Sequence, residues 1–383
     1  MRLNKAVFIN RTYKIRLKYL VCFLLLISCF SCDSRDEEIL LEDKFYSMES
    51  TRDLWGNILF CMEENDNAFL YYYSRSENKL LAYRLEGDIF KEISSYNMGK
   101  EFNNIYIRNP DSIFLFHDRR GNFSLFNHDY QLLDTFTVPL VINSIEYDIY
   151  GGSSQDIGIY DDYLILSVIP DLPLNIFFKS YFEIKYSLIN HKIEDHFLTY
   201  PSIYDGKNWW GGTGIRYSKC INPEGNMLFS FNIVDSLFEY SHGNIQKIEV
   251  PGSKYFTPPP PMDPKLEQNP QYSKMYQDTI GFYVDLMYDP YRDIYLRVAA
   301  HNQSPTYIDS ATHTLKRNMF FDREWSIMFF DREFNLIGEQ KFERKKYFFG
   351  KVLIIKDGIL IAPGDGQSRG ENIRFQLFKY KNL

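Results

Sequence analysis

Residues 111–136 read DSIFLFHDRRGNFSLFNHDYQLLDTF, in which short apolar runs alternate with polar turns. The apolar runs are Ile113–Phe116, Phe123–Phe126 and Leu132–Phe136. Runs of about four to eight residues that are rich in Phe, Tyr, Ile and Leu, and that are separated by Gly, Asn and Asp, are typical of antiparallel strands. The stretch therefore predicts consecutive strands joined by hairpin turns.

The first of these runs is apolar on both faces. Side chains alternate between the two faces of a strand, so Ile113 and Leu115 share one face while Phe114 and Phe116 share the other. Two apolar faces predict a sheet that is covered on both sides. These aromatic side chains are therefore expected in the core rather than in a binding site.

Similar units recur along the chain. Phe126–Leu133 matches Phe330–Ile337 in residue type, and the looser relatives are Tyr83–Ile93, Tyr186–Ile193, Tyr240–Ile248 and the truncated Phe378–Leu383. Their turns lie near residues 87, 128, 191, 243, 332 and 381. Propeller blades repeat at about 40–50 residues with four strands each. The repeat predicts an all-β, six-bladed β-propeller over residues 39–383, with a two-sheet β-sandwich as the alternative.

The last unit stops within its hairpin and lacks an outer strand. The strand expected at Ile39–Tyr46 would supply it and close the ring without a covalent link. Two insertions are expected, near residues 252–280 and 301–324. The first contains the stiff proline run Thr257–Pro264, followed by a loop with one short helix that Pro270 interrupts.

The N-terminus has the pattern of an export signal. Residues 1–28 contain six basic residues and no acidic residue, and they end in an apolar run, Tyr19–Ile27, that is too short to span a bilayer. Leu26-Ile27-Ser28-Cys29 is similar to a bacterial lipobox. Residues 1–28 are therefore expected to be a lipoprotein signal peptide and residues 29–38 an acidic tether, with Cys29 lipidated and Cys32 as the alternative. A plain secretory signal or an uncleaved anchor are the other interpretations.

Charge and cysteine content restrict the partners and the cross-links. The full chain has a formal charge of −7, and removal of the six basic signal residues lowers it to −13. A negatively charged domain repels nucleic-acid phosphates, so no nucleic-acid partner is expected. Beyond the tether only Cys61 and Cys220 remain, which leaves room for one disulfide bridge but not for a disulfide framework.

Short blocks of the sequence resemble a known family. They are Asp111–Phe116, Tyr288–Arg297, Trp325–Asp331 with Leu336–Glu339, and Asp357–Ile361. Together they resemble uncharacterised lipoproteins of Bacteroides-type bacteria, which carry a domain of unknown function with a TolB-like six-bladed propeller. The resemblance implies a fold and an envelope location, but no activity. Leu296, where the family more often has tyrosine, and the glycine-rich tail Gly364–Gly370 depart from the pattern.

The sequence contains no recognisable catalytic or metal-binding motif. None of the seven histidines stands in an H-x-x-x-H or H-E-x-x-H arrangement, so no metal and no other cofactor is expected. Propeller hydrolases place carboxylates at the central channel, where they act as acids or bases. Candidates for such a role are Asp156, Asp161, Asp162, Asp205, Asp289 and Asp365. Loop solubility is the simpler explanation for each of them.

Two aromatic stretches are candidates for ligand or partner binding. Asp205 opens a glycine-rich loop that contains Trp209 and Trp210, and tryptophan faces stack on sugars or on protein partners. The alternative is that both tryptophans cap the core. Arg292 and Arg297 lie among tyrosines, with Arg–aromatic stacking inside a blade as the alternative.

These observations predict a protein of the cell envelope, held at the outer membrane by an N-terminal lipid. It is expected to bind a ligand, or to act as a scaffold for an envelope protein or glycan. The alternative is an envelope hydrolase or lyase that acts on glycans or peptides.

Overall fold

A computed structural model describes the part of the chain that follows the tether. The described residues are 39–48, 58–64, 67–74, 77–98, 102, 104–109, 111–150, 157–204, 216–262, 264–267, 269–308, 315–364 and 373–381. The signal peptide, the acidic tether and both candidate lipidation sites, Cys29 and Cys32, lie outside these residues.

The stretch with alternating apolar runs belongs to a four-stranded antiparallel sheet. Its strands are β6 (Asn104–Asn109), β7 (Ser112–Phe116), β8 (Asn122–Phe126) and β9 (Leu132–Thr137). Phe114 and Phe116 pack in one core cluster, whereas Ile113 and Leu115 pack in another. The prediction that both faces of β7 are covered is therefore confirmed.

Three further sheets follow along the chain. The first contains β10 (Val141–Ile142), β11 (Ile145–Ile149), β12 (Ile157–Tyr160), β13 (Tyr163–Pro170), β14 (Glu183–Ser187) and β15 (Lys192–Phe197). The second is formed by β16 (Tyr217–Ile221), β17 (Met227–Phe231), β18 (Leu237–Ser241) and β19 (Asn244–Ile248). The third is formed by β20 (Phe282–Asp289), β21 (Ile294–Ala300), β24 (Trp325–Phe330) and β25 (Leu336–Phe342).

The largest sheet joins strands from both ends of the described chain. Its eight strands, in spatial order, are β2 (Ile58–Glu64), β3 (Asn67–Ser74), β4 (Lys79–Glu86), β5 (Ile89–Asn97), β1 (Leu40–Met48), β28 (Ile373–Tyr380), β27 (Gly358–Pro363) and β26 (Tyr347–Ile355). β1 pairs antiparallel with β28 from Leu40 to Met48, but it pairs with β5 only through Ser47 and Met48. The expected pairing of the N-terminal strand with the C-terminal unit is confirmed, and it covers an edge of β28 that would otherwise be open.

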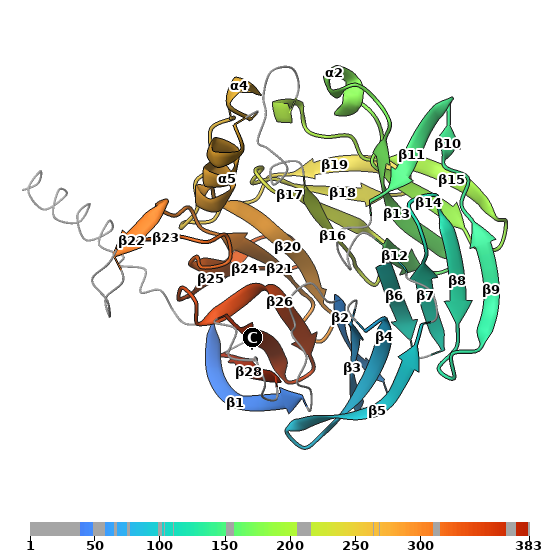
Figure 1. Cartoon of the computed structure of the whole chain (residues 1–383), viewed down its shortest axis with the longest axis horizontal. Coiled ribbons are helices and arrows are strands. Elements are labelled where there is room, and N and C mark those ends of the chain that lie inside the picture. Colours follow the sequence, from blue (N-terminus) through green and yellow to red (C-terminus); the bar gives the residue numbers. More distant parts are fainter. Residues whose placement is uncertain are drawn as a thin grey trace, which may run out of the picture. The chain divides into compact units, whose positions relative to one another are not determined.

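The first strands of successive groups contact one another in a closed series. β2 contacts β6, β6 contacts β12, β12 contacts β16, β16 contacts β20, β20 contacts β26, and β26 contacts β2. Figure 1 shows these strands around the middle of the drawing, with the remaining strands of each group farther out. The fold is all-β and propeller-like, and its core clusters lie between neighbouring sheets.

The two predicted insertions contain more regular structure than expected. Instead of one helix interrupted by Pro270, the chain forms α4 (Pro264–Glu267) and α5 (Pro270–Thr279). Pro270 occupies the first helical position, where a missing N–H costs nothing, and the Asn269 side chain caps α5 by accepting from the N–H of Gln271, 3.0 Å away. The insertion at 301–324 contains a two-stranded sheet of β22 (Thr306–Ile308) and β23 (Leu315–Arg317).

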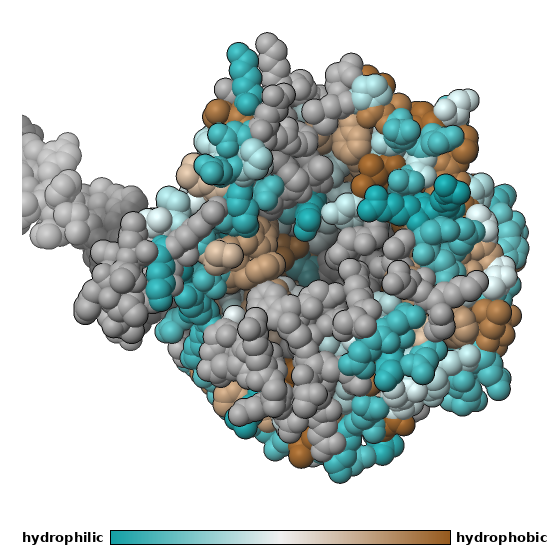
Figure 2. Space-filling view, viewed as in Figure 1, coloured by the Kyte–Doolittle hydropathy of each residue, from teal (hydrophilic) through white to brown (hydrophobic). Residues whose placement is uncertain are grey.

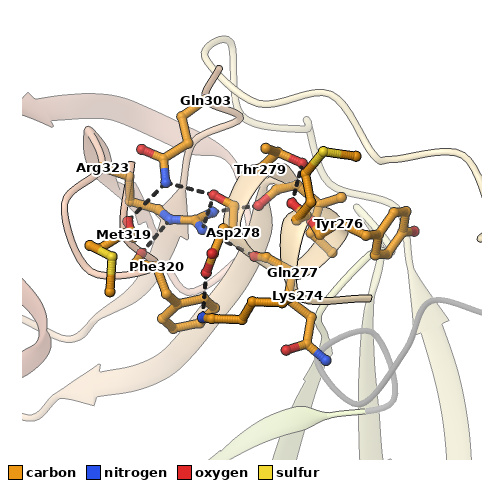
Figure 3. Close-up of polar contacts among 11 residues, drawn as sticks. Lys274, Tyr276, Gln277, Asp278, Thr279, Gln303, Met319, Phe320 and Arg323 are labelled. Atoms are coloured by element: carbon orange, nitrogen blue, oxygen red, sulfur yellow. Dashed lines mark hydrogen bonds and ion pairs between the residues drawn. The ribbon is translucent and has the colours of Figure 1, made fainter. Parts of the chain in front are cut away.

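A buried arginine holds α5 against this second insertion (Figure 3). Arg323 donates to backbone carbonyls of Asp278 (3.1 Å) and Phe320 (2.7 Å), and also to that of Ile280. Cations at a helix C-terminus satisfy its unpaired carbonyls and interact favourably with the negative end of the helix dipole. Gln303 donates to the carbonyls of Asp278 and Met319, so it joins the same two segments.

The other helical elements are short. They are α2 (Leu174–Phe177) and the 3₁₀ turn η1 (Ser202–Tyr204). No helix in the described part of the chain combines the length and the apolar composition that crossing a bilayer requires.

Candidate functional site

A pocket of about 480 Å³ lies where four of the first strands meet. It is lined by Tyr106 of β6, Gly158, Ile159 and Tyr160 of β12, Lys219, Cys220, Ile221, Asn222 and Pro223 of β16 and its turn, and Tyr288 and Pro290 of β20 and its turn. Ligand sites are typically concave and apolar, with a few polar groups that fix orientation. This pocket fits that description, because three tyrosines, two isoleucines and two prolines make up seven of its eleven lining residues. Figure 2 shows the apolar residues of the drawn face in several groups, the most extensive of them at the upper right.

The three tyrosines of the pocket are each held by the fold. The Tyr106 hydroxyl has a backbone hydrogen bond with Ile159, and the Tyr288 hydroxyl donates to Asp293 Oδ1 at 2.6 Å. The Tyr160 ring lies against Gly225 in the turn between β16 and β17, where an added Cβ would be 2.3 Å from the ring. Burial raises the pKa of Tyr106 and of Tyr288, so these phenols stay protonated at neutral pH.

Lys219 lines the pocket, but its charge is compensated inside the fold. Its Nζ lies 2.7 Å from Glu183 Oε2 and donates to Ser167 Oγ at 2.9 Å. The Tyr217 hydroxyl donates to the other oxygen of Glu183 at 2.7 Å. All of these groups are buried or nearly so. A buried ion pair with its remaining oxygens hydrogen-bonded is a structural arrangement, and removal of one partner would leave an uncompensated charge.

Cys220 is a free and largely buried thiol. Cys220 therefore forms no disulfide in the structure, and the side chain of Cys61, the other candidate for a bridge, lies outside those that the structure describes. Burial raises the pKa of Cys220 well above its ordinary value, so the thiol is protonated and is a poor nucleophile.

An exposed ionic network borders the pocket. Arg332, in the turn between β24 and β25, binds Glu224 in the turn between β16 and β17. Its Nε also lies 3.2 Å from Asp293 Oδ2, and Asp293 accepts the hydrogen bond from Tyr288. The network therefore connects two neighbouring sheets beside the lining residues Pro223 and Tyr288.

A second polar cluster lies away from the pocket and resembles a catalytic triad only in composition. The Ser326 hydroxyl donates to Glu339 Oε1 at 2.5 Å, and His301 Nε2 lies 2.9 Å from the same hydroxyl. In a catalytic triad the carboxylate orients the histidine, whereas here it binds the serine. All three side chains are buried, and burial lowers the pKa of His301 to about 4. The cluster is therefore a structural network.

Arg297 and Arg292, the two arginines predicted as binding candidates, make intramolecular contacts. Arg297 is fully buried, stacks 3.3 Å from the centre of the Tyr283 ring and donates to Ser230 Oγ at 2.8 Å. Arg292 lies 4.3 Å from the centre of the Tyr380 ring and pairs with Asp289 at 3.0 Å. The structure thus shows the stacking within the fold that the sequence offered as the alternative.

The remaining candidates fall into two groups. Asp161 and Asp162 form the exposed turn after β12, whereas Asp289 is buried and accepts a hydrogen bond from Tyr380 as well as the Arg292 contact. Asp156, Asp205, Trp209, Trp210 and Asp365 lie outside the described residues. Among the described residues, no three His, Cys, Asp or Glu side chains converge as a metal site requires.

The pocket tyrosines were not singled out from the sequence. One signal was present: Tyr160-Asp161 and Tyr288-Asp289 each end a first strand, so the same dipeptide recurs at equivalent points of two units. Only the strand assignment makes this equivalence visible, because β12 was not predicted.

Comparison with known proteins agrees with the fold. Residues 34–341 match the model of a domain of unknown function, DUF4221. The chain is similar to the crystal structure of a DUF4221 family member from Bacteroides vulgatus, with a TM-score of 0.71 and 16% identity over 90% of this chain and 98% of that one. It is also similar to a protein of Bacteroides fragilis proposed to be exported, with a TM-score of 0.50 and 10% identity over 91% of this chain and 97% of that one.

At such low sequence identities, the two structural similarities establish the fold alone. No curated protein matches the chain. The family match, in contrast, spans most of the sequence and includes three of the four blocks that carried the resemblance. The chain belongs to the DUF4221 family, whose function is unknown.

Proposed function

We propose that this chain is an exported, lipid-anchored protein of the cell envelope whose six-bladed propeller binds a ligand or a protein partner. In this proposal the eight-stranded sheet counts as two blades, since the pairing between β1 and β5 involves only two residues of each strand. The closed series of contacts from β2 to β26 supports six blades, with β1 as the outer strand of the last one.

The observation that carries the binding function is the pocket at the ends of β12, β16 and β20. Three tyrosines line it, and aromatic side chains dominate binding hot spots. Its lining groups are poorly suited to acid–base or nucleophilic chemistry, because Lys219 is paired with Glu183 and Cys220 is protonated.

The envelope location rests on the N-terminal sequence. The basic segment, the apolar run and Leu26-Ile27-Ser28-Cys29 support lipidation at Cys29, with Cys32 as the alternative, and hence anchoring at the outer membrane. The similar B. fragilis protein is itself proposed to be exported.

Labelling with radioactive palmitate tests the anchor. We expect incorporation in the wild type, loss in the Cys29→Ala variant and retention in the Cys32→Ala variant. Retention in Cys29→Ala with loss in Cys32→Ala would move the anchor to Cys32, and labelling of the double variant would refute lipidation at either cysteine.

Affinity capture from solubilised envelopes tests the binding function. We expect Tyr160→Ala to reduce partner recovery by about tenfold, since about 1–3 kcal/mol is typical for loss of an aromatic contact residue. Tyr181→Ala, an exposed tyrosine outside the pocket, is the matched control and should retain capture. A double Trp209→Ala, Trp210→Ala variant tests the glycine-rich loop that Asp205 opens, which the sequence indicated as a binding candidate. Equal recovery from wild type and Tyr160→Ala would contradict a role for the pocket.

A further inference from the structure

The charges around the pocket are unequal in a way that restricts its ligand. At the border, one cation, Arg332, contacts two carboxylates, Glu224 and Asp293. All three side chains are nearly half exposed, at 48%, 48% and 44%. The border therefore has one more carboxylate than cation, a net charge of −1 over these three side chains.

Among the described lining residues, Lys219 is the only charged side chain, and it adds no net positive charge. Lys219 is balanced by Glu183 at 2.7 Å. Two further charged groups of opposite sign act on lining residues, Arg108 on Tyr106 and Asp285 on Cys220. Over these described residues of the border and the interior, carboxylates exceed cations by one.

The tyrosine rings favour the same sign of charge. An aromatic face carries negative electrostatic potential and attracts ammonium groups. Tyr106, Tyr160 and Tyr288 reach the pocket from three different strands, so a ligand inside it meets several rings at once. An anion would meet both the carboxylate excess and these rings unfavourably.

We infer that the pocket takes a cationic ligand, an amine or quaternary ammonium group attached to an apolar or aromatic body. The inference rests on the proposed binding function and deepens it, because it names the chemical class that the pocket selects. The apolar body would lie against Ile159 and Ile221, and the charge would face Glu224 and Asp293.

Three probes of one shape and different charge test the inference: benzylamine, benzyl alcohol and benzoate. Titration calorimetry with the full chain in detergent should show benzylamine binding at least about tenfold more tightly than either other probe. The preference should shrink as salt is raised from about 50 mM to 500 mM, because exposed charges are screened. Equal affinities, a preference for benzoate, or no binding of benzylamine would overturn the inference.

Variants at the border give effects of opposite sign. Glu224→Gln and Asp293→Asn should each weaken benzylamine binding about two- to fivefold, whereas Arg332→Gln should strengthen it by a similar factor. Glu333→Gln, on the same exposed turn as Arg332, removes a charge outside the network and should have no effect. Unfolding cannot mimic a gain in affinity, and thermal melts of all four variants verify the fold.

The two proposals fail separately. If capture of the partner depends on Tyr160 but the probes show no charge preference, the cationic ligand is wrong and the binding function stands. If capture is independent of Tyr160, the proposed function of the pocket is wrong.

Discussion

The hairpins that reveal the repeat depend on two residue positions. In the turn after β8, the backbone carbonyl of Asn127 accepts from the N–H of Tyr130, and its side chain accepts from the N–H of Gln131. Asp331 makes the equivalent bonds after β24, to Phe334 and Asn335. Tyr130 and Phe334 both adopt positive φ, at 58° and 63°. Asn and Asp are favoured in such turns because their side chains replace a backbone acceptor.

Gly225 provides a test of how the pocket is held together. It has φ of +83° and packs against the Tyr160 ring, whereas Gly243 has φ of +80° with no atom within 4 Å of an added Cβ. We expect Gly243→Ala to cost about 1 kcal/mol of stability from backbone strain alone. Gly225→Ala adds displacement of Tyr160 and should cost about 2–4 kcal/mol.

Denaturant unfolding of both glycine variants measures this difference. The affinity for benzylamine should also fall in Gly225→Ala and stay unchanged in Gly243→Ala. Equal losses of stability would show that Tyr160 does not depend on the glycine.

His301 makes stability depend on pH. Burial lowers its pKa from the ordinary 6.5 to about 4, so between these values the unfolded chain binds a proton that the folded chain does not. Stability should therefore fall as pH falls through this window, by about 2 kcal/mol between pH 7 and pH 5. His301→Gln removes the titrating group and should lose correspondingly less over the same range. Identical pH dependence in wild type and variant, measured by urea unfolding, would contradict the assignment.

At the level of elements, β1 lies far in sequence from β28, the strand with which it pairs to complete the sheet. Leu40 pairs with Tyr380, and the N–H of Lys381 donates to the carbonyl of Ile39 at 2.8 Å, so the end of β28 lies beside the start of β1. A two-residue turn such as Asn-Gly can therefore connect them as a hairpin. A circular permutant that begins at residue 49 and continues from residue 381 through this turn into residues 39–48 should fold.

Thermal unfolding distinguishes the permutant from a simple deletion. The permutant should melt within a few degrees of the unpermuted domain, whereas a chain lacking residues 39–48 should melt well below it or aggregate, because the edge of β28 is uncovered. A deletion variant as stable as the permutant would show that β1 is dispensable.

Helix α5 shows how the surroundings change the effect of a residue. The sequence suggested that Pro270 interrupts a helix, yet proline at the first helical position favours the start of one. The C-terminal carbonyls of α5 are satisfied by Arg323, from a different insertion. No local pattern around Pro270 indicated this partner.

For the molecule as a whole, the sequence determined the features that depend only on residues close together in the chain. Alternation of apolar side chains and the Asn, Asp and Gly turns placed most strands and their hairpins, because strand period and turn geometry are local properties. The truncated last unit also indicated that the N-terminal strand must complete it. The strands β6 and β12 escaped prediction although β6 is no shorter than β7 and β8, because polar residues or glycine limit their uninterrupted apolar runs to three residues or fewer.

The tertiary structure alone decided which side chains form a site. Tyr106, Tyr160 and Tyr288 meet in the pocket only because β6, β12, β16 and β20 contact one another in turn. It also decided which charged side chains are paired inside the fold. Arg297 and Lys219 have buried partners, whereas Arg332 lies at an exposed border. Proximity between distant residues and loss of solvent are properties of the assembled sheets, and no local pattern of residues contains them.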